Sequence, residues 1–248
     1  MDAGTESLRA GIFDVQGNPL AFSSTNYATS FPQPGWAEQD PHDWWNALGL
    51  SVRSAVLKAA IDPEAIASMA VDTTCCSVVA LDDNAEPLRP CLIWMDLRSA
   101  PQTNKVLSTG DSALRVNSNG QGPVSAEWMI PKALWIHDNE PELFERAATI
   151  CEFQDYINLR LTGRRSASIN NISVRWHYDR SRGGIPGTML EKLGLSALEE
   201  KWPAEVLNLG ELVGGLTTKA ADHLGLRKDL PVVQGGADAF IGMIAVSY

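Results

Sequence analysis

The first residues of the chain carry side chains that suit the binding of a phosphate group. In "MDAGTESLRAGIFD", residues 1–14, Gly4 allows an anion to approach the backbone closely. The hydroxyls of Thr5 and Ser7 and the loop N–H groups are donors for phosphate oxygens. Asp2 is a ligand for Mg²⁺, directly or through water. An ordinary polar turn is the alternative, and the signatures GxGxxG and GxxxxGK do not occur in the sequence.

A second carboxylate follows a Gly-Gly turn near residue 240. In "VVQGGADAF", residues 232–240, Asp238 comes after a predicted strand and begins a predicted helix. A carboxylate in this position is suited to act as a general base that faces a cleft. It also suits a structural role, because a negative charge at a helix N-terminus interacts favourably with the helix dipole. The motif by itself leaves both roles open.

Two further polar turns follow predicted strands. "VDTTCCS", residues 71–77, presents Cys75 where a strand ends, and such a turn either lines a polyol pocket or simply connects two strands around a small buried cysteine. "IWMDLRS", residues 93–99, places Asp96 and Arg98 after an apolar strand. These two residues are candidates for a binding site or for a surface ion pair of little energetic value.

An aromatic motif provides candidates for sugar contacts. "SAEWMIPK", residues 125–132, combines Ser125, Glu127, Trp128 and Lys132. A serine at a helix start is a common N-cap, which explains Ser125 without a function. Trp128 belongs either to the core or to a sugar site, because an indole ring stacks on the apolar face of a sugar. The chain has eight tryptophans, and we expect most of them to be structural.

The predicted secondary structure that positions the candidate residues begins, at the N-terminus, with strands. Alternating residues predict strands at 9–14 and 19–29, with a third at 35–39, which together form an antiparallel meander. The spacing of Trp45, Leu48 and Val52 then predicts a helix over 40–59. Short apolar runs predict further strands, and the pattern indicates a mixed α/β domain with a partly parallel sheet. The further strands are predicted at 66–72, 77–84, 91–95 and 231–233.

From about residue 100 the pattern is mostly helical. Apolar residues predict a helix over 125–139 that Pro131 kinks or divides into two pieces. A further helix over 153–162 ends on Gly163, which suits a helix C-terminus. Residues 181–187, "SRGGIPG", are expected to form a loop.

Charge and hydropathy exclude several classes of partner. The net charge is −10 and the sequence pI is about 4.8, so binding to nucleic acid or to an anionic membrane surface is not expected. The sequence has no run of 18 apolar residues, and its N-terminus lacks the basic start and apolar stretch of a signal peptide. The cysteines have no zinc-site spacing, adjacent cysteines rarely bridge each other, and reduced thiols predict a cytoplasmic protein. The cysteines are Cys75, Cys76, Cys91 and Cys151.

Taken in order, these motifs resemble the FGGY carbohydrate kinases over nearly the whole chain. The matching blocks are "DAGTESLRAGIFD", "GWAEQDPHDWW", "DTTCCSVVALD", "LIWMDLR", "SAEWMIPKALW", "LTG" and "GGADAFIGM". The third and fifth blocks, with "VRWHY", resemble the ribulokinase-like branch of the family. The resemblance implies transfer of the ATP γ-phosphoryl group to a sugar hydroxyl. It also implies a ribonuclease H-like, actin/hexokinase-type α/β lobe with helical insertions between about residues 100 and 230.

The resemblance also implies roles for individual residues. In the family, the opening loop approaches the phosphates and the metal, the GGxD aspartate is catalytic, and the first lobe binds the sugar. The implied phosphate contacts are Gly4, Thr5 and Arg9, and the implied Mg²⁺ ligand is Asp2. The implied catalytic residue is Asp238, and the implied sugar contacts are Cys75, Asp96, Glu127, Trp128 and Asp238.

The sequence departs from the family pattern in two ways. Family members are about twice as long, because a second lobe carries the adenosine pocket and the rest of the phosphate site. The apolar strand that leads into the opening loop is also short here, since only Met1 precedes Asp2. We therefore expect residues 1–248 to be the N-terminal lobe, with a truncated first strand and without the ATP lobe. Apolar surface exposed by these losses predicts self-association.

The substrate is expected to be a ketopentose. L-ribulokinases tend to carry a lysine at the position of Ser173 in "SVRWHY", so the sequence favours D-ribulose or a related sugar. Two other interpretations remain open. In one, the chain is a sugar-binding or regulatory module without catalysis. In the other, it is a generic α/β domain whose motifs are coincidental.

Overall fold

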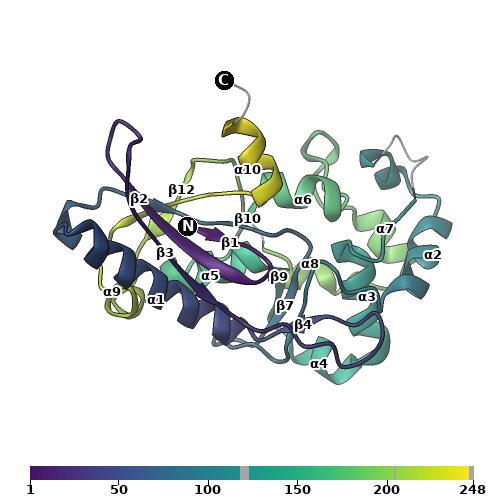
Figure 1. Cartoon of the computed structure of the whole chain (residues 1–248). Helices are drawn as coiled ribbons and strands as arrows, with labels where there is room; N and C mark the ends of the chain where they lie inside the picture. Colours follow the sequence, from purple (N-terminus) through teal and green to yellow (C-terminus); the bar gives the residue numbers. More distant parts are fainter. Residues whose placement is uncertain (118–122, 204, 246–248) are drawn as a thin grey trace.

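A twisted sheet near the N-terminus carries the opening loop (Figure 1). The structure is a computed structural model and describes residues 1–117, 123–203 and 205–245. Strands β2 (Ser7–Phe13) and β3 (Pro19–Asn26) form the predicted hairpin. Strand β1 (Asp2–Ala3) pairs antiparallel with β2 and parallel with β6 (Asp72–Thr73), which gives the strand order β3-β2-β1-β6. This order brings Asp2 beside Asp72.

Helix α1 (Pro41–Ala59) packs against the β2–β3 hairpin and confirms the predicted helix. The side chain of Asp40 caps it by accepting the N–H of His42 at 2.9 Å. Trp44, fully buried on the inner side of α1, stacks on Phe153 with 3.6 Å between ring centroids. Helix α1 thereby joins the hairpin to the middle of the molecule.

The predicted third strand of the meander belongs to a different sheet. Strand β4 (Glu38–Gln39) pairs with β8 (Cys91–Leu92) and not with β3. Its only contact of this kind with the preceding segment, among the described residues, is an isolated bridge between Ser30 and Glu38. This second sheet has the order β4-β8-β7-β9. Its remaining strands are β7 (Val78–Leu81) and β9 (Thr149–Glu152).

The strand predicted over 66–72 is divided between two sheets. Strand β5 (Met69–Ala70) pairs parallel with β13 (Pro231–Val233), and β6 pairs with β1. Two further sheets are small and lie next to the Gly-Gly turn, since β13 precedes the turn and Oγ of Ser168 in β10 (Ser166–Ser168) donates to the carbonyl oxygen of Gly235. They are β12-β13-β5, with β12 at Leu212–Gly215, and β10-β11, with β11 at Glu205–Leu207.

The part of the chain after residue 100 is rich in helices, as predicted (Figure 1). Helix α3 (Met129–Asn139) begins four residues later than expected, so Pro131 lies in its first turn, where a missing N–H leaves no helical hydrogen bond broken. The predicted kink is therefore wrong. Within 181–187, the structure has the end of a 3₁₀ turn and the start of a helix as well as a loop. Helix α10 (Asp238–Ala245) is confirmed to Ala245, and residues 246–248 lie outside the described part.

The remaining helices are short. The α-helices are α2 (Ala100–Ser108), α4 (Pro141–Arg146), α5 (Phe153–Thr162), α6 (Ile169–Arg175), α7 (Gly187–Lys192), α8 (Leu198–Lys201) and α9 (Thr218–Leu224). The 3₁₀ turns are η1 (Pro63–Ala65), η2 (Ser112–Val116) and η4 (Arg180–Arg182).

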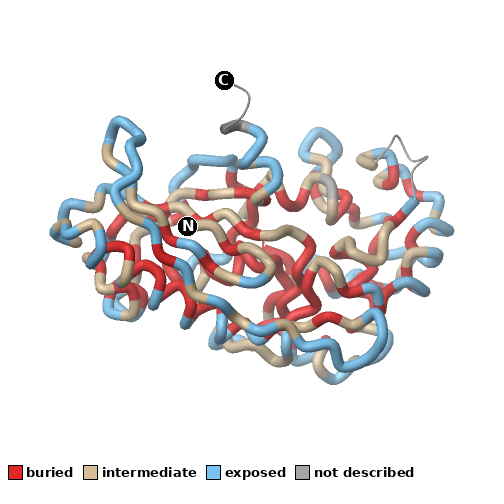
Figure 2. Tube along the Cα trace, in the orientation of Figure 1, coloured by how far each residue is buried: buried red, intermediate tan, exposed pale blue. Residues whose placement is uncertain are grey.

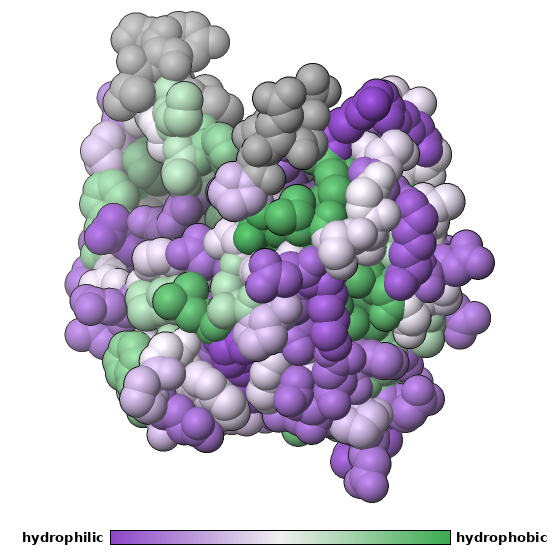
Figure 3. Space-filling view, turned by 90° about the vertical axis from the view of Figure 1, so that its right-hand side faces the viewer, coloured by the Kyte–Doolittle hydropathy of each residue, from purple (hydrophilic) through white to green (hydrophobic). Residues whose placement is uncertain are grey.

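Two apolar clusters form the interior (Figure 2). The first lies between α1, the hairpin and α9, and includes Trp44, Leu48 and Val232. The second lies under α3 and α8 and includes Trp176 and Trp202. The face shown in Figure 3 is a mosaic of hydrophilic and hydrophobic patches. Among the described residues, no helix has both the length and the apolar character that a membrane span needs.

Candidate active site

A tight contact of the Gly-Gly turn with the neighbouring backbone fixes the position of Asp238. A Cβ atom on Gly235 would lie 2.0 Å from the carbonyl oxygen of Val71, and one on Gly236 would lie 2.6 Å from Oδ1 of Asn170. Neither position therefore accepts a side chain without rearrangement. The close approach allows the N–H of Thr73 to donate to the carbonyl oxygen of Gly236 at 3.2 Å. Asp238 follows directly and begins α10 beside strand β6.

Three carboxylates converge at this point, from β1, β6 and α10. Burial raises the pKa of Asp238, and the negative charge of Asp2 raises it further. Burial also raises the pKa of Asp72, to which Asp2 and Asp238 both add, while the N-terminal ammonium of Met1 opposes the shift. Asp238 is half-buried and remains accessible. The cluster is therefore an acidic surface that holds protons more readily than isolated carboxylates do.

Cys75 lies close enough to this cluster for the charge of Asp238 to act on it. Hydrogen bonding from the thiol of Cys76 and the nearby guanidinium of Arg175 lower the pKa of Cys75 to about 6, although burial and the charge of Asp238 oppose the shift. The side chain of Cys75 is half-buried. Residues 163 positions apart in the sequence thus meet at one surface, because β6 and the Gly-Gly turn lie side by side.

Trp128 joins this surface through Arg175. The Arg175 guanidinium carbon lies 5.9 Å from the centroid of the Trp128 ring, and the His177 ring meets the same indole edge-on at 5.6 Å. Burial lowers the pKa of His177 to about 4, so this ring is neutral at physiological pH. Glu127 is half-buried beside Trp128, and its N–H donates to Oγ of Ser125 at 3.2 Å. Arg175 therefore links the cysteine turn to the tryptophan.

The opening loop is held by side chains from three other segments. Nε1 of Trp94 donates to Oγ1 of Thr5 at 3.0 Å, and Nε2 of Gln39 donates to the Thr5 carbonyl oxygen at 2.7 Å. The hydroxyl of Tyr27 donates to the carbonyl oxygen of Gly4. A Cβ on Gly4 would be 3.7 Å from the nearest atom, so the chain itself does not demand glycine there.

The other predicted member of the phosphate site lies on the exposed side of the same sheet. Arg9 on β2 forms an ion pair with Asp2 at 3.3 Å, and both side chains are exposed. The pair places a positive charge beside the acidic cluster. It also occupies one carboxylate oxygen of the residue that was expected to hold Mg²⁺.

Asp96 is not on this surface, which corrects its prediction as a sugar contact. Its side chain is fully buried, and its oxygens accept the N–H of Ala37 at 2.7 Å and a two-point contact from Arg98. Arg98 also pairs with Glu38 at 2.8 Å and lies 3.7 Å above the ring of Trp36. We call Glu38, Asp96, Arg98 and Trp36 the ion-pair knot. It stabilises the fold and leaves Asp96 no free surface for a sugar.

The donor set of the acidic cluster suits a hard cation such as Mg²⁺, which binds carboxylate oxygens and retains several waters. In the part of the chain that the structure describes, no group of three or more His, Cys, Asp or Glu side chains is arranged around a metal position. Asp2 and Asp238 offer carboxylate oxygens of the kind that Mg²⁺ binds, and the described residues do not enclose a metal position.

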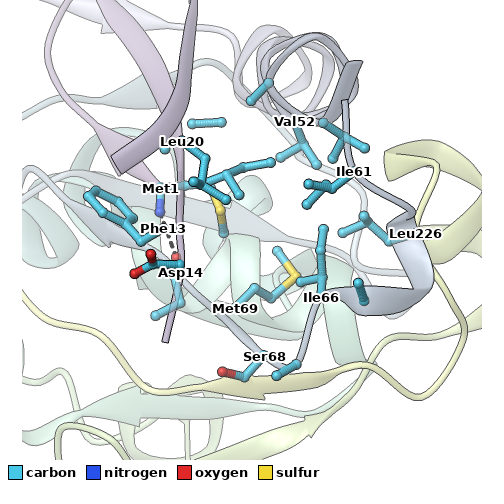
Figure 4. Close-up of a pocket in the computed structure, with 18 of the residues that line it drawn as sticks. Met1, Phe13, Asp14, Leu20, Val52, Ile61, Ile66, Ser68, Met69 and Leu226 are labelled. Carbon is cyan, nitrogen blue, oxygen red and sulfur yellow. Dashed lines mark hydrogen bonds between the residues drawn. The ribbon is translucent and has the colours of Figure 1, made fainter. Parts of the chain in front are cut away.

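A cavity of about 650 Å³ lies elsewhere, between the hairpin, α1 and residues 61–70 (Figure 4). Its walls are mainly apolar, with Leu20, Val52, Ile66 and Met69 pointing into it. The N-terminal ammonium of Met1 reaches its edge and donates to the carbonyl oxygen of Ala70 at 2.8 Å. The cavity lacks the convergent polar groups of a sugar site.

Self-association of the chain, which was predicted from exposed apolar surface, stays a prediction.

Comparison with known proteins decides the family. Residues 1–245 match the N-terminal domain of the FGGY family of carbohydrate kinases. The chain belongs to this family. The fold prediction is confirmed, because the solved structures that the chain resembles are FGGY sugar kinases with the actin/hexokinase-type fold. A xylulose kinase from Rhodospirillum rubrum superposes with a TM-score of 0.89 and 27% identity, over 99% of this chain and 50% of that one.

Curated kinases with related sequences are named for different substrates. An autoinducer-2 kinase of Salmonella choleraesuis is 28% identical, over 99% of this chain and 46% of that protein. A D-ribulokinase of Saccharomyces cerevisiae is 26% identical, over 98% of this chain and 37% of that protein. The chain thus spans half or less of the length of these relatives.

Two residues that the structure places at this candidate site were not among the predicted site residues. Asp72 stands in a turn that was predicted to line a polyol pocket or to connect two strands, but its position beside Asp2 was not predicted, because the parallel pairing of β6 with β1 is not visible in the sequence. Arg175 stands in the quoted "VRWHY" block, yet only the structure places its charge between Cys75 and Trp128. The signal was its position directly before a buried tryptophan at the end of α6.

Proposed function

We propose that this chain is the sugar-binding lobe of an ATP-dependent kinase that phosphorylates a ketopentose such as D-ribulose. The observation that carries the proposal is the convergence of Asp238 with Cys75 and the opening loop. A carboxylate, a polar turn and a rigid loop of donors are the groups that hold a hydroxyl next to a phosphoryl group. Membership of the FGGY family supports the reaction class.

Asp238 is the proposed general base. Its carboxylate accepts the proton of the sugar hydroxyl as that oxygen attacks the γ-phosphorus of ATP. Burial and the charge of Asp2 raise the pKa of Asp238, which increases its proton affinity while it stays accessible. The Gly-Gly turn restricts where the carboxylate lies, and correct position is the larger part of catalysis in phosphoryl transfer.

The opening loop is the proposed phosphate contact. The N–H groups around Gly4 and the hydroxyl of Thr5 donate to phosphate oxygens, and Arg9 adds a positive charge at the rim. Mg²⁺, held through water by Asp2, would neutralise charge on the phosphoryl oxygens. Tyr27, Gln39 and Trp94 keep the loop in place, so little reorganisation is needed when a nucleotide arrives.

Cys75, Glu127 and Trp128 are the proposed sugar contacts, together with Asp238. The indole packs on carbon–hydrogen groups of the sugar, and the thiol and carboxylates bind its hydroxyls. D-ribulose is favoured because Ser173 stands where L-ribulokinases tend to carry lysine, and the similarity to a D-ribulokinase is consistent with this choice. In the structure Oγ of Ser173 donates to the carbonyl oxygen of Ile169, so this side chain is turned to its own helix.

The second candidate is a sugar-binding module without catalysis. It is favoured by the small number of ATP contacts that the described residues offer. The ATP contacts of the opening loop are few, and each hydrogen bond contributes only about 0.5–1.5 kcal/mol net. We therefore expect the 248-residue chain to bind sugar but to show no appreciable turnover of ATP.

Calorimetry with D-ribulose, D-xylulose and L-ribulose tests the sugar assignment directly. We expect D-ribulose to bind most tightly, and Asp238→Asn to weaken binding by about 10–100-fold, because it removes a hydrogen bond to a charged acceptor. Asp83→Asn, at an exposed position in another turn, is the matched control and should bind like the parent. Equal binding by Asp238→Asn and parent would refute the site. In a coupled ADP-release assay on the same chain, steady sugar-dependent turnover of ATP would rule out the module without catalysis.

A further inference from the structure

We propose that Cys75 and Cys76 form a peroxide-sensitive thiol pair, in which Cys75 is oxidised and Cys76 closes it into a reversible vicinal disulfide. The proposal concerns the thiols alone and does not depend on the proposed kinase function. It contrasts with the other two cysteines, Cys91 and Cys151, which are buried in the interior.

The two sulfur atoms are already neighbours. Sγ of Cys76 donates to Sγ of Cys75 across 3.8 Å. Cys75 is half-buried at the surface of the candidate site, where a small oxidant reaches it, whereas Cys91 is 0% exposed and Cys151 is 1% exposed. Accessibility therefore selects one thiol of the four for attack.

The turn that holds the pair is fixed from both sides. Cys76 has a left-handed backbone conformation with φ of +64°, which a side-chain-bearing residue adopts at a cost. Its N–H donates to Oε2 of the buried Glu152 at 3.0 Å. Its carbonyl oxygen accepts from Nζ of the buried Lys132 at 2.7 Å. The conformation that brings the thiols together is thus maintained by partners outside the turn.

The surroundings favour the reactive form of Cys75. The thiolate is the nucleophile in cysteine chemistry, and a neighbouring hydrogen-bond donor and a guanidinium both stabilise it. Cys76 supplies the donor and Arg175 the positive charge, so the pKa of Cys75 falls to about 6. The hydrogen bond to Cys75 and burial raise the pKa of Cys76, and burial raises the pKa of Cys91 and Cys151, so Cys75 is the thiol of the four that meets peroxide as a thiolate.

The reaction has two steps with hydrogen peroxide as the oxidant. The Cys75 thiolate attacks one peroxide oxygen, an S–O bond forms, the O–O bond breaks, and the departing hydroxide takes up a proton to become water. The Cys76 sulfur then attacks the Cys75 sulfur, an S–S bond forms, and the S–O bond breaks. The second hydroxide leaves with the Cys76 proton as another water. In total, two thiols and one peroxide give one disulfide and two waters.

The resulting bond should be easy to reduce. Adjacent Cα atoms are about 3.8 Å apart, below the usual range of about 4.4–6.8 Å for disulfides. Such strain makes a disulfide more oxidising, which is a property of labile and regulatory bonds. Closure also removes a thiol from the surroundings of Asp238.

Peptide mapping by mass spectrometry after treatment with equimolar hydrogen peroxide at pH 7 tests the proposal. We expect the Cys75–Cys76 peptide to lose two hydrogen atoms and to regain them with a dithiol reductant. Cys91 and Cys151 serve as internal controls and should stay free. The rate of Cys75 alkylation by iodoacetamide should rise with pH around a midpoint of about 6.

Two serine variants separate the roles of the pair. In Cys76→Ser, Cys75 should gain a single oxygen atom that dimedone traps, because no thiol resolves it. In Cys75→Ser, Cys76 should resist peroxide. The proposal is overturned if Cys75 in the parent reacts no faster than Cys91 and Cys151. It is also overturned if the oxygen adduct on Cys75 persists in the parent while Cys76 remains free. Sugar calorimetry on the reduced chain is unaffected by either result, so it judges the proposed function separately.

Discussion

Asp238 and Asp96 both follow apolar strands in the sequence, yet they lie in opposite environments. Asp238 is half-buried beside two other carboxylates, with no cation paired to it in any described contact. Asp96 is fully enclosed in the ion-pair knot, where Arg98 occupies both of its oxygens. The carboxylate of Asp238 therefore stays accessible to a ligand, whereas the carboxylate of Asp96 is already paired with Arg98.

The difference follows from what each loop packs against. The turn before Asp238 consists of glycines that lie against the Val71 backbone and the side chain of Asn170, and among the described ion pairs none involves Asp238. The turn around Asp96 lies against Trp36 and Trp135, whose faces hold the guanidinium of Arg98 in place. The two carboxylates are thus distinguished by their partners and not by their position after a strand.

The largest expected effect is on stability at the knot. Asp96→Asn should lower the free energy of unfolding by about 3–5 kcal/mol, because it leaves the buried Arg98 without its main counter-charge. Urea denaturation at pH 7 measures this, with Asp83→Asn as the exposed control. A loss below about 1 kcal/mol would mean that Glu38 alone compensates Arg98, and the contrast with Asp238 would weaken.

Asp155 is a buried carboxylate whose effect on the free energy of unfolding depends on pH and is somewhat smaller than that of Asp96→Asn. Asp155 accepts the N–H of Glu152 at the start of α5, and burial raises its pKa to about 7. Between about pH 4 and pH 7 the folded chain holds a proton there that the unfolded chain has lost. Its stability contribution is therefore complete below about pH 4 and is lost as the pH rises toward 7.

Asp155→Asn keeps an acceptor oxygen and removes this titration. The unfolding free energy of the parent should fall relative to that of the variant between pH 4 and pH 7, by up to about 4 kcal/mol. Urea titrations of both chains across this range provide the comparison. Parallel curves would show that Asp155 is ionised in the folded chain throughout.

The smallest effect is expected at the rim of the open site. Arg9→Ala removes an ion pair with Asp2 whose two side chains are exposed, so unfolding should change by no more than about 0.5 kcal/mol. Thermal melts at low and high salt measure it, and the small difference should vanish at high salt. A loss comparable to that of Asp96→Asn would show that the two regions are not energetically distinct.

The sequence was sufficient for elements whose signal is local. The 3.6-residue spacing and Asp40 cap predicted α1, and the Gly-Gly turn predicted the start of α10. Contacts between distant segments were out of reach. Nothing local places β4 in the second sheet, pairs Arg98 with Glu38, or shows that a Cβ on Gly235 would strike Val71. The family resemblance predicted that Cys75 and Asp238 belong to one site. It did not predict that the side chain of Asp96 is fully buried.

Trp128 has a spectroscopic consequence. Trp44, Trp176 and Trp202 are fully buried, so their emission reports on the folded core, whereas Trp128 is half-exposed between the Arg175 guanidinium and the His177 ring. A solute that binds between Cys75 and Arg175 would alter the polarity around this indole. The difference in fluorescence between the parent chain and Trp128→Phe is therefore an optical signal of the site's occupancy, which needs neither a label nor a second lobe.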